Sequence, residues 1–386
     1  MVDTGLSPST LNLFNSKSKK ITQKILTKAD IEINGDRPWD IQVHNENFYQ
    51  RVVYQGSLGL GESYVEGWWD CFKLDDFFTK ILRSKIFEYR IKNNLGFWLE
   101  IVKAKLWNMQ SSSRSSQVGE QHYDIGNELY QSMLDSRLTY SCGYWKNAKN
   151  LEEAQENKLD LICRKLQLEK GMTLLDIGCG WGSLMKYAAE KYQVSCVGFT
   201  VSKEQIKLGE KMCASLPVKF FFQDYRKSKG LFDRVASVGM FEHVGYKNYR
   251  IFLELVNRCL KDDGLFLLHT IGSEDTNVVG DRWVDKYIFP NAMLPSASQI
   301  CQAAEKLLVI EDWHNFGQYY DLTLMAWLEN FEKNWDRLKL RYGDKFYRMW
   351  KYYLCSFAGA FRARHLQLWQ IVFSKNGIIN GYQSVR

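Results

Sequence analysis

The stretch TLLDIGCGWGSL, residues 173–184, decides the fold class of this chain. Residues 173–177 are an apolar run that predicts a buried strand, and residues 183–192, SLMKYAAEKY, predict a helix. Between them stand Gly178, Gly180 and Gly182, which allow the backbone to turn with positive φ and to approach a ligand closely. A strand, a glycine turn and a helix in this order are typical of one repeat of a parallel α/β sheet.

The same alternation continues on both sides of this stretch. A helix is expected in LEEAQENKLDLICRKLQL, with Asn150 as its N-cap and Gly171 after its end. Later strands are predicted in VSCVGF, VKFFFQD, FDRVASVGM and GLFLLHTIG, and helices in SKEQIKLGEKMCASL and KNYRIFLELVNRCL. This pattern predicts a doubly wound, mostly parallel sheet within residues 122–386. In such sheets ligands bind outside the carboxyl ends of the strands. The polar residues at those ends are Asp176, Thr200, Asp224, Glu242 and His269.

A Ser-rich stretch divides the chain. Residues 109–121, MQSSSRSSQVGEQ, predict a linker between a front section, 1–108, and the α/β section. The front section contains GSLGLGESYVEGWWDC, whose three glycines follow no clear strand, so a packing or turn role is favoured over a phosphate loop. Because no catalytic constellation occurs there, the front section is expected to be a smaller mixed accessory domain that docks, binds or assists assembly.

Composition places the chain among ordinary globular proteins. Its 386 residues are 45% hydrophobic and 25% charged, with a net charge of +7. It has neither an apolar run long enough to span a membrane nor a secretory signal at its start, so a cytoplasmic protein is expected. The nine cysteines are scattered without zinc-ligand spacing, which predicts reduced, mostly buried thiols and no metal site.

The excess positive charge is concentrated late in the chain. Residues 331–375 hold ten Lys and Arg against three acids, interleaved with Trp and Tyr. This mixture suits an anionic membrane surface, a nucleic acid or a solvated helix. A nucleic-acid partner is not expected, because the sequence has no NPPY-like tetrapeptide and no dominant basic stripe elsewhere.

The glycine turn favours S-adenosylmethionine as its ligand. It lacks the Lys-Ser/Thr ending of a phosphate loop, and its GxGxG spacing without an acid after the next strand does not fit a dinucleotide fingerprint. Asp176 would accept from a ligand ammonium or from the amides of the loop. Other residues are expected to contact the rest of S-adenosylmethionine. Thr200, Ser202 and Gln205 would bind its ribose, and Asp224 and Tyr225 its adenine. A tight turn without any ligand is the alternative.

Seven segments in order then resemble a known family. They are LTYSCGYW, LLDIGCGWGSL, VGFTVSKEQ, VGMFEHVGYKNY, LHTIG, WHNFGQYYDLTLMAW and GAFRARHLQLWQIVFS. Together with INGDRPWDIQV in the front section, they resemble the cyclopropane-fatty-acyl-phospholipid synthases of the bacterial two-domain type, over nearly the whole chain.

The resemblance implies transfer of a methylene group from S-adenosylmethionine to the cis double bond of an acyl chain in a membrane phospholipid. It also implies a homodimer, formed through the front domain, that associates peripherally with the inner membrane. Bicarbonate serves as the base in this family. Matching positions imply that Cys142, Glu242, His269, the Ile271 backbone and Tyr320 hold it, and that Tyr140 and Ser141 contact the methyl donor.

Other interpretations of these residues and of the chain stay open at this point. From the residues alone Glu242 could itself be the base, whereas the resemblance makes it the group that orients bicarbonate. Cys142 could be an ordinary buried thiol, His269 a core histidine and Tyr320 one of 21 tyrosines. The rival functions are a lipid methyltransferase that stops at a methyl branch or an exomethylene, a small-molecule methyltransferase, and an idle lipid-binding protein.

Overall fold

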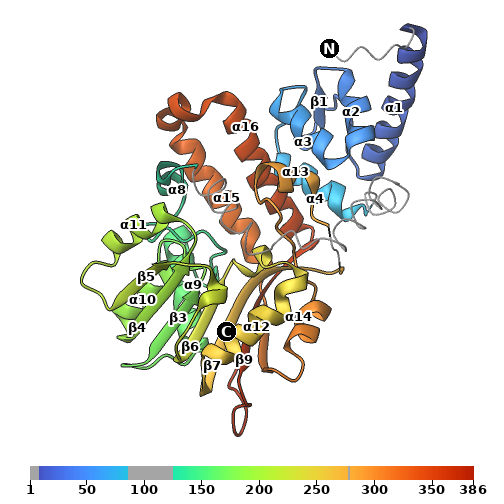
Figure 1. Cartoon of the computed structure of the whole chain (residues 1–386). Helices are drawn as coiled ribbons and strands as arrows, with labels where there is room; N and C mark the ends of the chain where they lie inside the picture. The colour runs from blue at the N-terminus through green and yellow to red at the C-terminus, as the bar shows by residue number, and fades with distance from the viewer. Residues whose placement is uncertain (1–7, 86–124, 277–278) are drawn as a thin grey trace.

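The computed structural model of the chain describes residues 8–85, 125–276 and 279–386, with side chains from residue 16 onward. In these residues one sheet of seven strands has the order β5-β4-β3-β6-β7-β9-β8 (Figure 1). The strands are β3 (Thr173–Ile177), β4 (Ser195–Thr200), β5 (Val218–Phe222), β6 (Phe232–Val238), β7 (Leu260–Ser273), β8 (Val309–Asn315) and β9 (Leu366–Ser374).

Most of this sheet is parallel, as predicted. The strand that precedes the glycine turn, β3, lies between β4 and β6 and pairs parallel with both. Two strands fall outside the predicted set, β8 and β9, and β9 pairs antiparallel with its neighbours β7 and β8. Every residue of β9 is buried, so its apolar and polar residues do not alternate as they would on a half-exposed strand.

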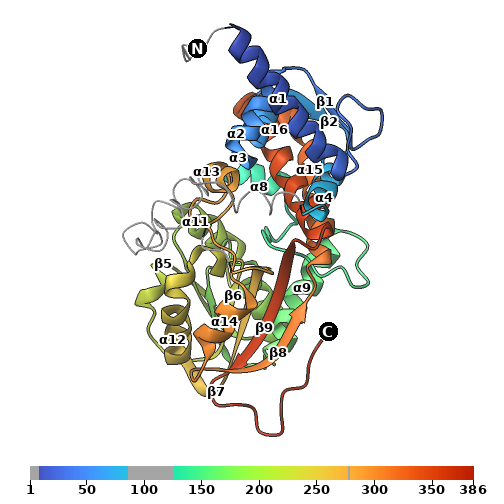
Figure 2. The same cartoon turned by 90° about the vertical axis from the view of Figure 1, so that its right-hand side faces the viewer.

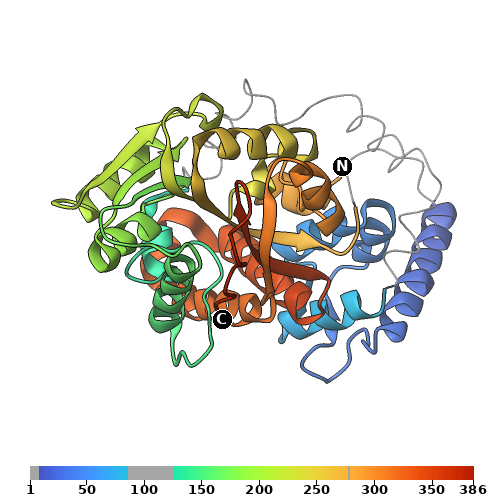
Figure 3. The same cartoon turned by 90° about the horizontal axis from the view of Figure 1, so that it is seen from below.

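Helices cover both faces of the sheet (Figure 3). On one face α9 (Leu151–Lys165) and α10 (Ser183–Tyr192) pack on Leu174, Cys196, Ala236, Leu267 and Val372. On the other face α12 (Tyr249–Cys259) and α14 (Ala297–Ala304) pack on the alternate strand residues. The Asn150 side chain accepts a hydrogen bond from the Glu153 amide and caps α9, as predicted. Helix α11 (Lys203–Met212) follows β4 beside the edge strand β5.

A helical layer stands above the carboxyl ends of the strands (Figure 2). It contains α8 (Asn127–Met133), α13 (Arg282–Tyr287), α15 (Gln318–Lys333) and α16 (Trp335–Arg362). The long helix α16 is interrupted at Gly343, where φ is +74°. The front section comprises α1 (Pro8–Lys28), β1 (Ile41–Val43), α2 (Asn47–Gln55), α3 (Ser57–Val65), β2 (Trp69–Cys71) and α4 (Leu74–Arg83).

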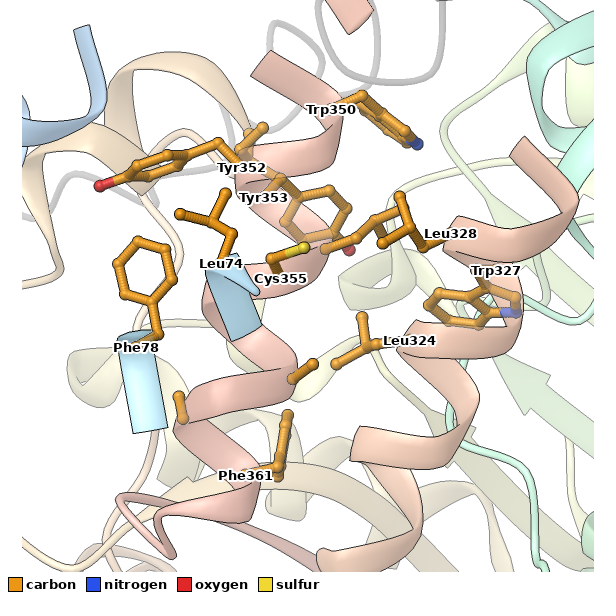
Figure 4. Close-up of a cluster of buried hydrophobic side chains, with 14 of the residues drawn as sticks. Leu74, Phe78, Leu324, Trp327, Leu328, Trp350, Tyr352, Tyr353, Cys355 and Phe361 are labelled. Atoms are coloured by element: carbon orange, nitrogen blue, oxygen red, sulfur yellow. The ribbon is translucent and has the colours of Figure 1, made fainter. Parts of the chain in front are cut away.

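The front section and the helical layer share one hydrophobic core (Figure 4). Leu74 and Phe78 of α4 lie beside Tyr352 and Cys355 of α16 in this cluster, and Leu324 of α15 lies on its other side. The predicted linker, residues 109–121, lies outside the described residues. The proposed division into domains therefore stays a prediction, although the described part of the front section packs directly on α16.

The glycines of the front section have a packing role, as predicted. Gly59 and Gly61 lie inside α3. A Cβ atom on Gly59 would lie 2.4 Å from the Arg51 carbonyl oxygen, and one on Gly61 would lie 2.2 Å from the Trp283 ring. Only glycine therefore lets α3 approach α2 and α13 this closely.

The expectations about cysteines and membrane spans can be compared with the structure. All nine cysteines are free, and all except Cys301 are buried. Among residues 8–85, 125–276 and 279–386, no helix combines the length and apolar character that crossing a bilayer requires. The same residues contain no group of three or more His, Cys, Asp or Glu arranged to hold a metal ion.

Candidate active site

A cavity of about 70 Å³ opens where β3 ends and the glycine turn begins. Six of the residues predicted to contact the methyl donor line it, so we call it the donor cavity. They are Tyr140, Ser141, Asp176, Gly178, Gly180 and Gln205. The backbone takes φ values of +87° at Gly178 and +54° at Gly180, which a side chain would strain. Gly182 has φ of +85° and precedes α10, but a Cβ there would meet the Phe220 ring rather than the cavity.

Asp176 contributes a carboxyl group to the wall of this cavity. Its side chain is buried, and Oδ1 has no hydrogen-bond partner among the described residues. Burial raises the pKa of the Asp176 carboxyl to about 7, and the charge of Lys158 acts in the opposite direction. An acceptor oxygen left free in a cavity suits a ligand that brings a donor, such as the ammonium of an amino acid.

The three residues expected at the ribose form a bonded cluster at the end of β4. The Thr200 hydroxyl donates to Gln205 Oε1 at 2.7 Å, and the Ser202 hydroxyl caps α11 by accepting from the Gln205 amide at 3.3 Å. Of the three, Gln205 lines the cavity. The cluster has the polar groups that sugar hydroxyls need. Its contact with the ribose stays a prediction.

The two residues expected at the adenine lie beyond β5. Asp224 caps the short helix η1 (Tyr225–Lys227) by accepting from the Arg226 amide at 2.9 Å. The Tyr225 ring packs against Phe252 with centroids 5.3 Å apart, and its hydroxyl is buried. Neither residue lines the cavity described above, and their contact with adenine stays a prediction.

Glu242 lies in the short helix η2 (Phe241–His243), directly after the carboxyl end of β6. Its Oε1 accepts from the Ile271 amide at 2.7 Å, while Oε2 is buried without a partner among the described residues. Burial raises the pKa of the Glu242 carboxyl to about 7. Ile271 therefore contacts Glu242 through its backbone N–H, so that N–H is already engaged by the protein.

His269 lies two residues before Ile271 on β7, and its side chain points to the same face of the sheet. Its Nδ1 is 3.2 Å from the Gln370 amide nitrogen of β9, while Nε2 is buried and unpartnered in the described part of the chain. Burial lowers the pKa of His269, so the ring is neutral. A neutral ring whose Nδ1 accepts from Gln370 carries its proton on Nε2, which can then donate to a bound group.

Cys142 is held by Thr323 of α15. The Thr323 hydroxyl accepts from the Gly143 amide at 3.0 Å and from the Trp145 indole at 2.9 Å, and lies 3.8 Å from the Cys142 sulfur. The thiol is buried and its pKa is raised by that burial, so it remains protonated. A thiol that stays protonated is a poor nucleophile.

Tyr320 and Tyr140 flank the same indole. The ring centroids of Trp327 and Tyr140 are 5.2 Å apart, and those of Trp327 and Tyr320 are 6.1 Å apart. Tyr320 also stacks on Phe361 at 4.6 Å, and the Tyr140 hydroxyl lies 2.9 Å from that of Tyr353. Through Trp327 these contacts connect Tyr140, which lines the cavity, with Tyr320, one of the residues expected to hold bicarbonate.

Four polar residues that support these groups were missed in the sequence. They are Gln155, Lys158, Thr323 and Gln370. A signal existed for the first two, because they stand three residues apart on the apolar stripe of a predicted helix, where a polar residue needs a partner. Nothing marked the other two, since their partners lie far away in the sequence.

A sheet of this order, with one reversed strand and a glycine turn beside a buried acid, defines the class I S-adenosylmethionine-dependent methyltransferase fold. The sequence model of the family described as mycolic acid cyclopropane synthetase matches residues 110–371. The chain belongs to this family.

Individual relatives agree with this assignment. The chain is 52% identical over 367 residues to the cyclopropane-fatty-acyl-phospholipid synthase of Escherichia coli strain K12, which covers 95% of this chain and 96% of that protein. Among solved structures, the cyclopropane synthase MmaA2 from Mycobacterium tuberculosis is similar with a TM-score of 0.64 at 28% identity, over 68% of this chain and 98% of that chain. The mycolic acid cyclopropane synthase CmaA1, complexed with SAH and CTAB, gives a TM-score of 0.64 at 30% identity, over 68% of this chain and 98% of that chain. The resemblance, the fold class and the enzyme class drawn from the sequence are confirmed.

Proposed function

We propose that this protein transfers a methylene group from S-adenosylmethionine to the cis double bond of an unsaturated acyl chain in a membrane phospholipid, which forms a cyclopropane ring. We further propose that bicarbonate is the base. The observation that carries this proposal is a pair of buried atoms, Glu242 Oε2 and His269 Nε2, that have no hydrogen-bond partner among the described residues and lie beside the strand ends that bear the donor cavity. An acceptor and a donor left free in one region suit a small planar oxyanion that both donates and accepts.

The donor cavity fits S-adenosylmethionine, and the Glu242 region fits bicarbonate. Gly178 and Gly180 leave space along the cavity wall, and Asp176 offers a free acceptor oxygen there. When bound, the sulfonium supplies the methyl group and bicarbonate supplies the base that removes a proton from that methyl after its transfer. Glu242 would accept the bicarbonate hydroxyl proton as a hydrogen bond, while His269 and Tyr320 would donate to its oxygens.

The aromatic rings have a separate task. Attack of an alkene on a methyl group leaves positive charge on the lipid, which must be kept from water. The ring of Trp327 lies 5.2 Å from that of Tyr140 and 6.1 Å from that of Tyr320, and such rings present π faces that stabilise a cation. Tyr140 lines the donor cavity, and Tyr320 is one of the residues expected to hold bicarbonate, so these rings reach from the site of the methyl donor to a group beside the proposed base.

The test uses purified protein, vesicles of cis-monounsaturated phospholipid, and S-adenosylmethionine with a fully deuterated methyl. Mass spectrometry of the released acyl chains counts the deuterons, and mild hydrogenation detects a surviving double bond. Two deuterons in a chain that resists hydrogenation demonstrate ring closure. Three deuterons demonstrate a methyl branch, and two with a reducible double bond an exomethylene, which are the rival lipid products. Donor binding without any label in the lipid refutes the function.

The bicarbonate part has its own test. The same assay in buffer purged of carbon dioxide should lose ring closure, and added bicarbonate should restore it. In Glu242→Gln the restoration should be much weaker, because the amide cannot accept the bicarbonate proton in the same way. Full activity in purged buffer would show that a protein group, with Glu242 the first candidate, is the base.

We also propose that the protein docks on anionic membranes and acts there as a homodimer on the cytoplasmic side of the inner membrane. The structure narrows the docking surface, because most basic residues of 331–375 form ion pairs with acids. These acids are Asp70, Asp75, Asp76, Glu128, Asp262, Asp321, Glu329, Glu332 and Asp344. What supports docking is the exposed first half of α16, where Leu340 is 98% exposed and Lys345 is exposed and forms no ion pair with the described residues.

Vesicle sedimentation at several salt concentrations tests the docking proposal. Binding should require anionic lipid, weaken as salt rises, and weaken further in Leu340→Ser. Lys375→Ser, which removes a basic residue of the same segment at its far end, is the matched control and should bind like the wild type. Binding that ignores salt and lipid charge would refute the surface. Light scattering of the purified chain tests the dimer, and a monomer at working concentration would refute it.

A further inference from the structure

Lys158 is a buried cation in the wall of the donor cavity. It lies in α9, is 1% exposed, and lines the cavity together with Ser141 and Asp176. Its Nζ donates to the Ser141 hydroxyl oxygen at 2.8 Å. A fully buried lysine is rare because desolvating an ammonium is costly, so its presence here requires a compensating role.

The strand alternation explains how Lys158 reaches this place. Leu174 of β3 and Leu267 of β7 pack on α9 and α10. Asp176 and His269 each follow one of these leucines by two residues, so their side chains point to the same face of the sheet. Lys158 therefore faces the donor cavity and the side of the sheet that carries His269. Gln155, one turn earlier on α9, donates to the Ser141 carbonyl at 2.8 Å, so the same helix face fixes both the backbone and the hydroxyl of Ser141.

The charges around Lys158 favour its protonated form against the cost of burial. Desolvation lowers the pKa of Lys158 to about 8, and the carboxylates of Asp135 and Asp176 oppose this shift. The Lys158 charge in turn opposes the rise that burial causes in the pKa of Asp176, and it contributes to the lowered pKa of His269. The ammonium thus stabilises a carboxylate that has no other partner on Oδ1 in the described residues.

We propose that Lys158 is a positioning residue of the donor site, which orients the Ser141 hydroxyl and balances the Asp176 carboxylate so that the two receive the amino-acid end of the methyl donor. This inference rests on the proposed function. A hydroxyl oxygen that accepts from an ammonium has its own proton free for another acceptor. Ser141 can then donate to the α-carboxylate of the donor, and the free oxygen of Asp176 can accept from its α-ammonium. A positive charge behind the hydroxyl also strengthens that donation.

The test compares two ligands that differ only at this end. S-adenosylhomocysteine carries the amino-acid group, and 5′-methylthioadenosine keeps the nucleoside and sulfur without it. In Lys158→Met we expect the affinity for S-adenosylhomocysteine to fall by about 10- to 100-fold, the effect of losing a hydrogen bond to a charged group. The affinity for 5′-methylthioadenosine should stay within about twofold, because that ligand never reaches Ser141 or Asp176. Titration calorimetry measures both.

Lys165→Met is the matched control. Lys165 is a second buried lysine of α9, bonded to His314 at 3.1 Å, and it does not line the cavity. Its loss should leave the affinity for S-adenosylhomocysteine unchanged. If Lys158→Met does not fold, Lys158→Gln keeps a polar group without the charge and should show the same selective loss. Ser141→Ala should show it too, and the loss in the double variant with Lys158→Met should be less than additive.

The outcomes separate this inference from the proposed function. An equal loss for both ligands would mean that Lys158 only maintains the shape of the cavity, and would overturn the inference. Unchanged binding of S-adenosylhomocysteine in Lys158→Met and Lys158→Gln would overturn it as well. A wild-type protein that binds neither ligand would instead overturn the proposed function.

Discussion

Replacing Glu242 with Gln changes both the stability and the chemistry of this protein, in opposite directions. The carboxyl has a pKa of about 7 in the folded chain against 4.5 ordinarily, because burial disfavours its charge. One pKa unit corresponds to about 1.4 kcal/mol, so ionising Glu242 in the folded state costs about 3 kcal/mol. Because the pKa of Glu242 is higher in the folded chain than in the unfolded chain, the protonated carboxyl contributes to the free energy of unfolding. This contribution is complete below pH 4.5 and is lost as the pH rises through 7.

The measurement is a difference between two proteins at two pH values. Between pH 5 and pH 8 the Glu242 carboxyl should remove about 2 to 3 kcal/mol from the free energy of unfolding of the wild type, and nothing from that of Glu242→Gln. Urea unfolding at both pH values gives this quantity, and other titrating groups cancel because both proteins share them. Glu204→Gln, at an exposed position of α11, is the control and should follow the wild type. A stability difference that does not change with pH would refute the raised pKa.

The same variant should lose turnover while it keeps its donor. Glu242 does not line the donor cavity, so the affinity for S-adenosylhomocysteine should stay within about twofold. Turnover should fall by about 10²- to 10⁴-fold, the usual contribution of acid–base groups. In the wild type, turnover should rise with pH through about 7, because only the carboxylate can accept the bicarbonate proton. Loss of donor affinity together with turnover would assign Glu242 to the donor site instead.

Three further predictions concern packing and reactivity. Thr323→Val removes the oxygen that accepts from the Gly143 amide and the Trp145 indole, and it should lower the free energy of unfolding by about 2 to 5 kcal/mol. An unchanged midpoint of urea unfolding would contradict the role of Thr323. Gly61→Ala places a Cβ 2.2 Å from Trp283, and the resulting strain of about 1 to 3 kcal/mol should exceed the gain in helix propensity and lower the melting temperature. Iodoacetamide should modify the native protein once, at Cys301, as intact-mass spectrometry can show, because the other cysteines are buried.

The parts of the site that belong to one local pattern could be predicted from the sequence. Asp176 and Gly178 stand where a strand ends and a glycine turn begins, and Glu242 stands at the end of the next parallel strand. Strand ends in a parallel sheet meet at one edge, so position along the chain determined position in space. The matched segments of the family then supplied Cys142 and Tyr320, whose places no local pattern determines.

The parts that depend on partners from distant segments could not be predicted. The basic segment 331–375 suited a charged surface by its composition, yet seven of its ten Lys and Arg pair with acids, and those acids come from α4, α8, α15 and other segments. Gln370 supports His269 only because β9 enters the sheet antiparallel beside β7, and β9 was outside the predicted set of strands. Such pairings follow from the topology, which residue spacing within one segment does not contain.

The front section is predicted from the sequence to be an accessory domain, but in the structure it is connected to the candidate active site. It contributes no described residue to the donor cavity. Yet Arg362 joins it to Tyr320, because its guanidinium bonds Asp321 at 2.8 and 2.9 Å and reaches Asp75 and Asp76 of α4 at 2.8 and 2.6 Å. The neighbour of Arg362 is Phe361, the ring on which Tyr320 stacks, as Figure 4 helps to locate. The acids of α4 therefore help to fix the helix segment that carries Phe361, the ring on which Tyr320 stacks, and we expect the front section to influence Tyr320 through geometry rather than through chemistry.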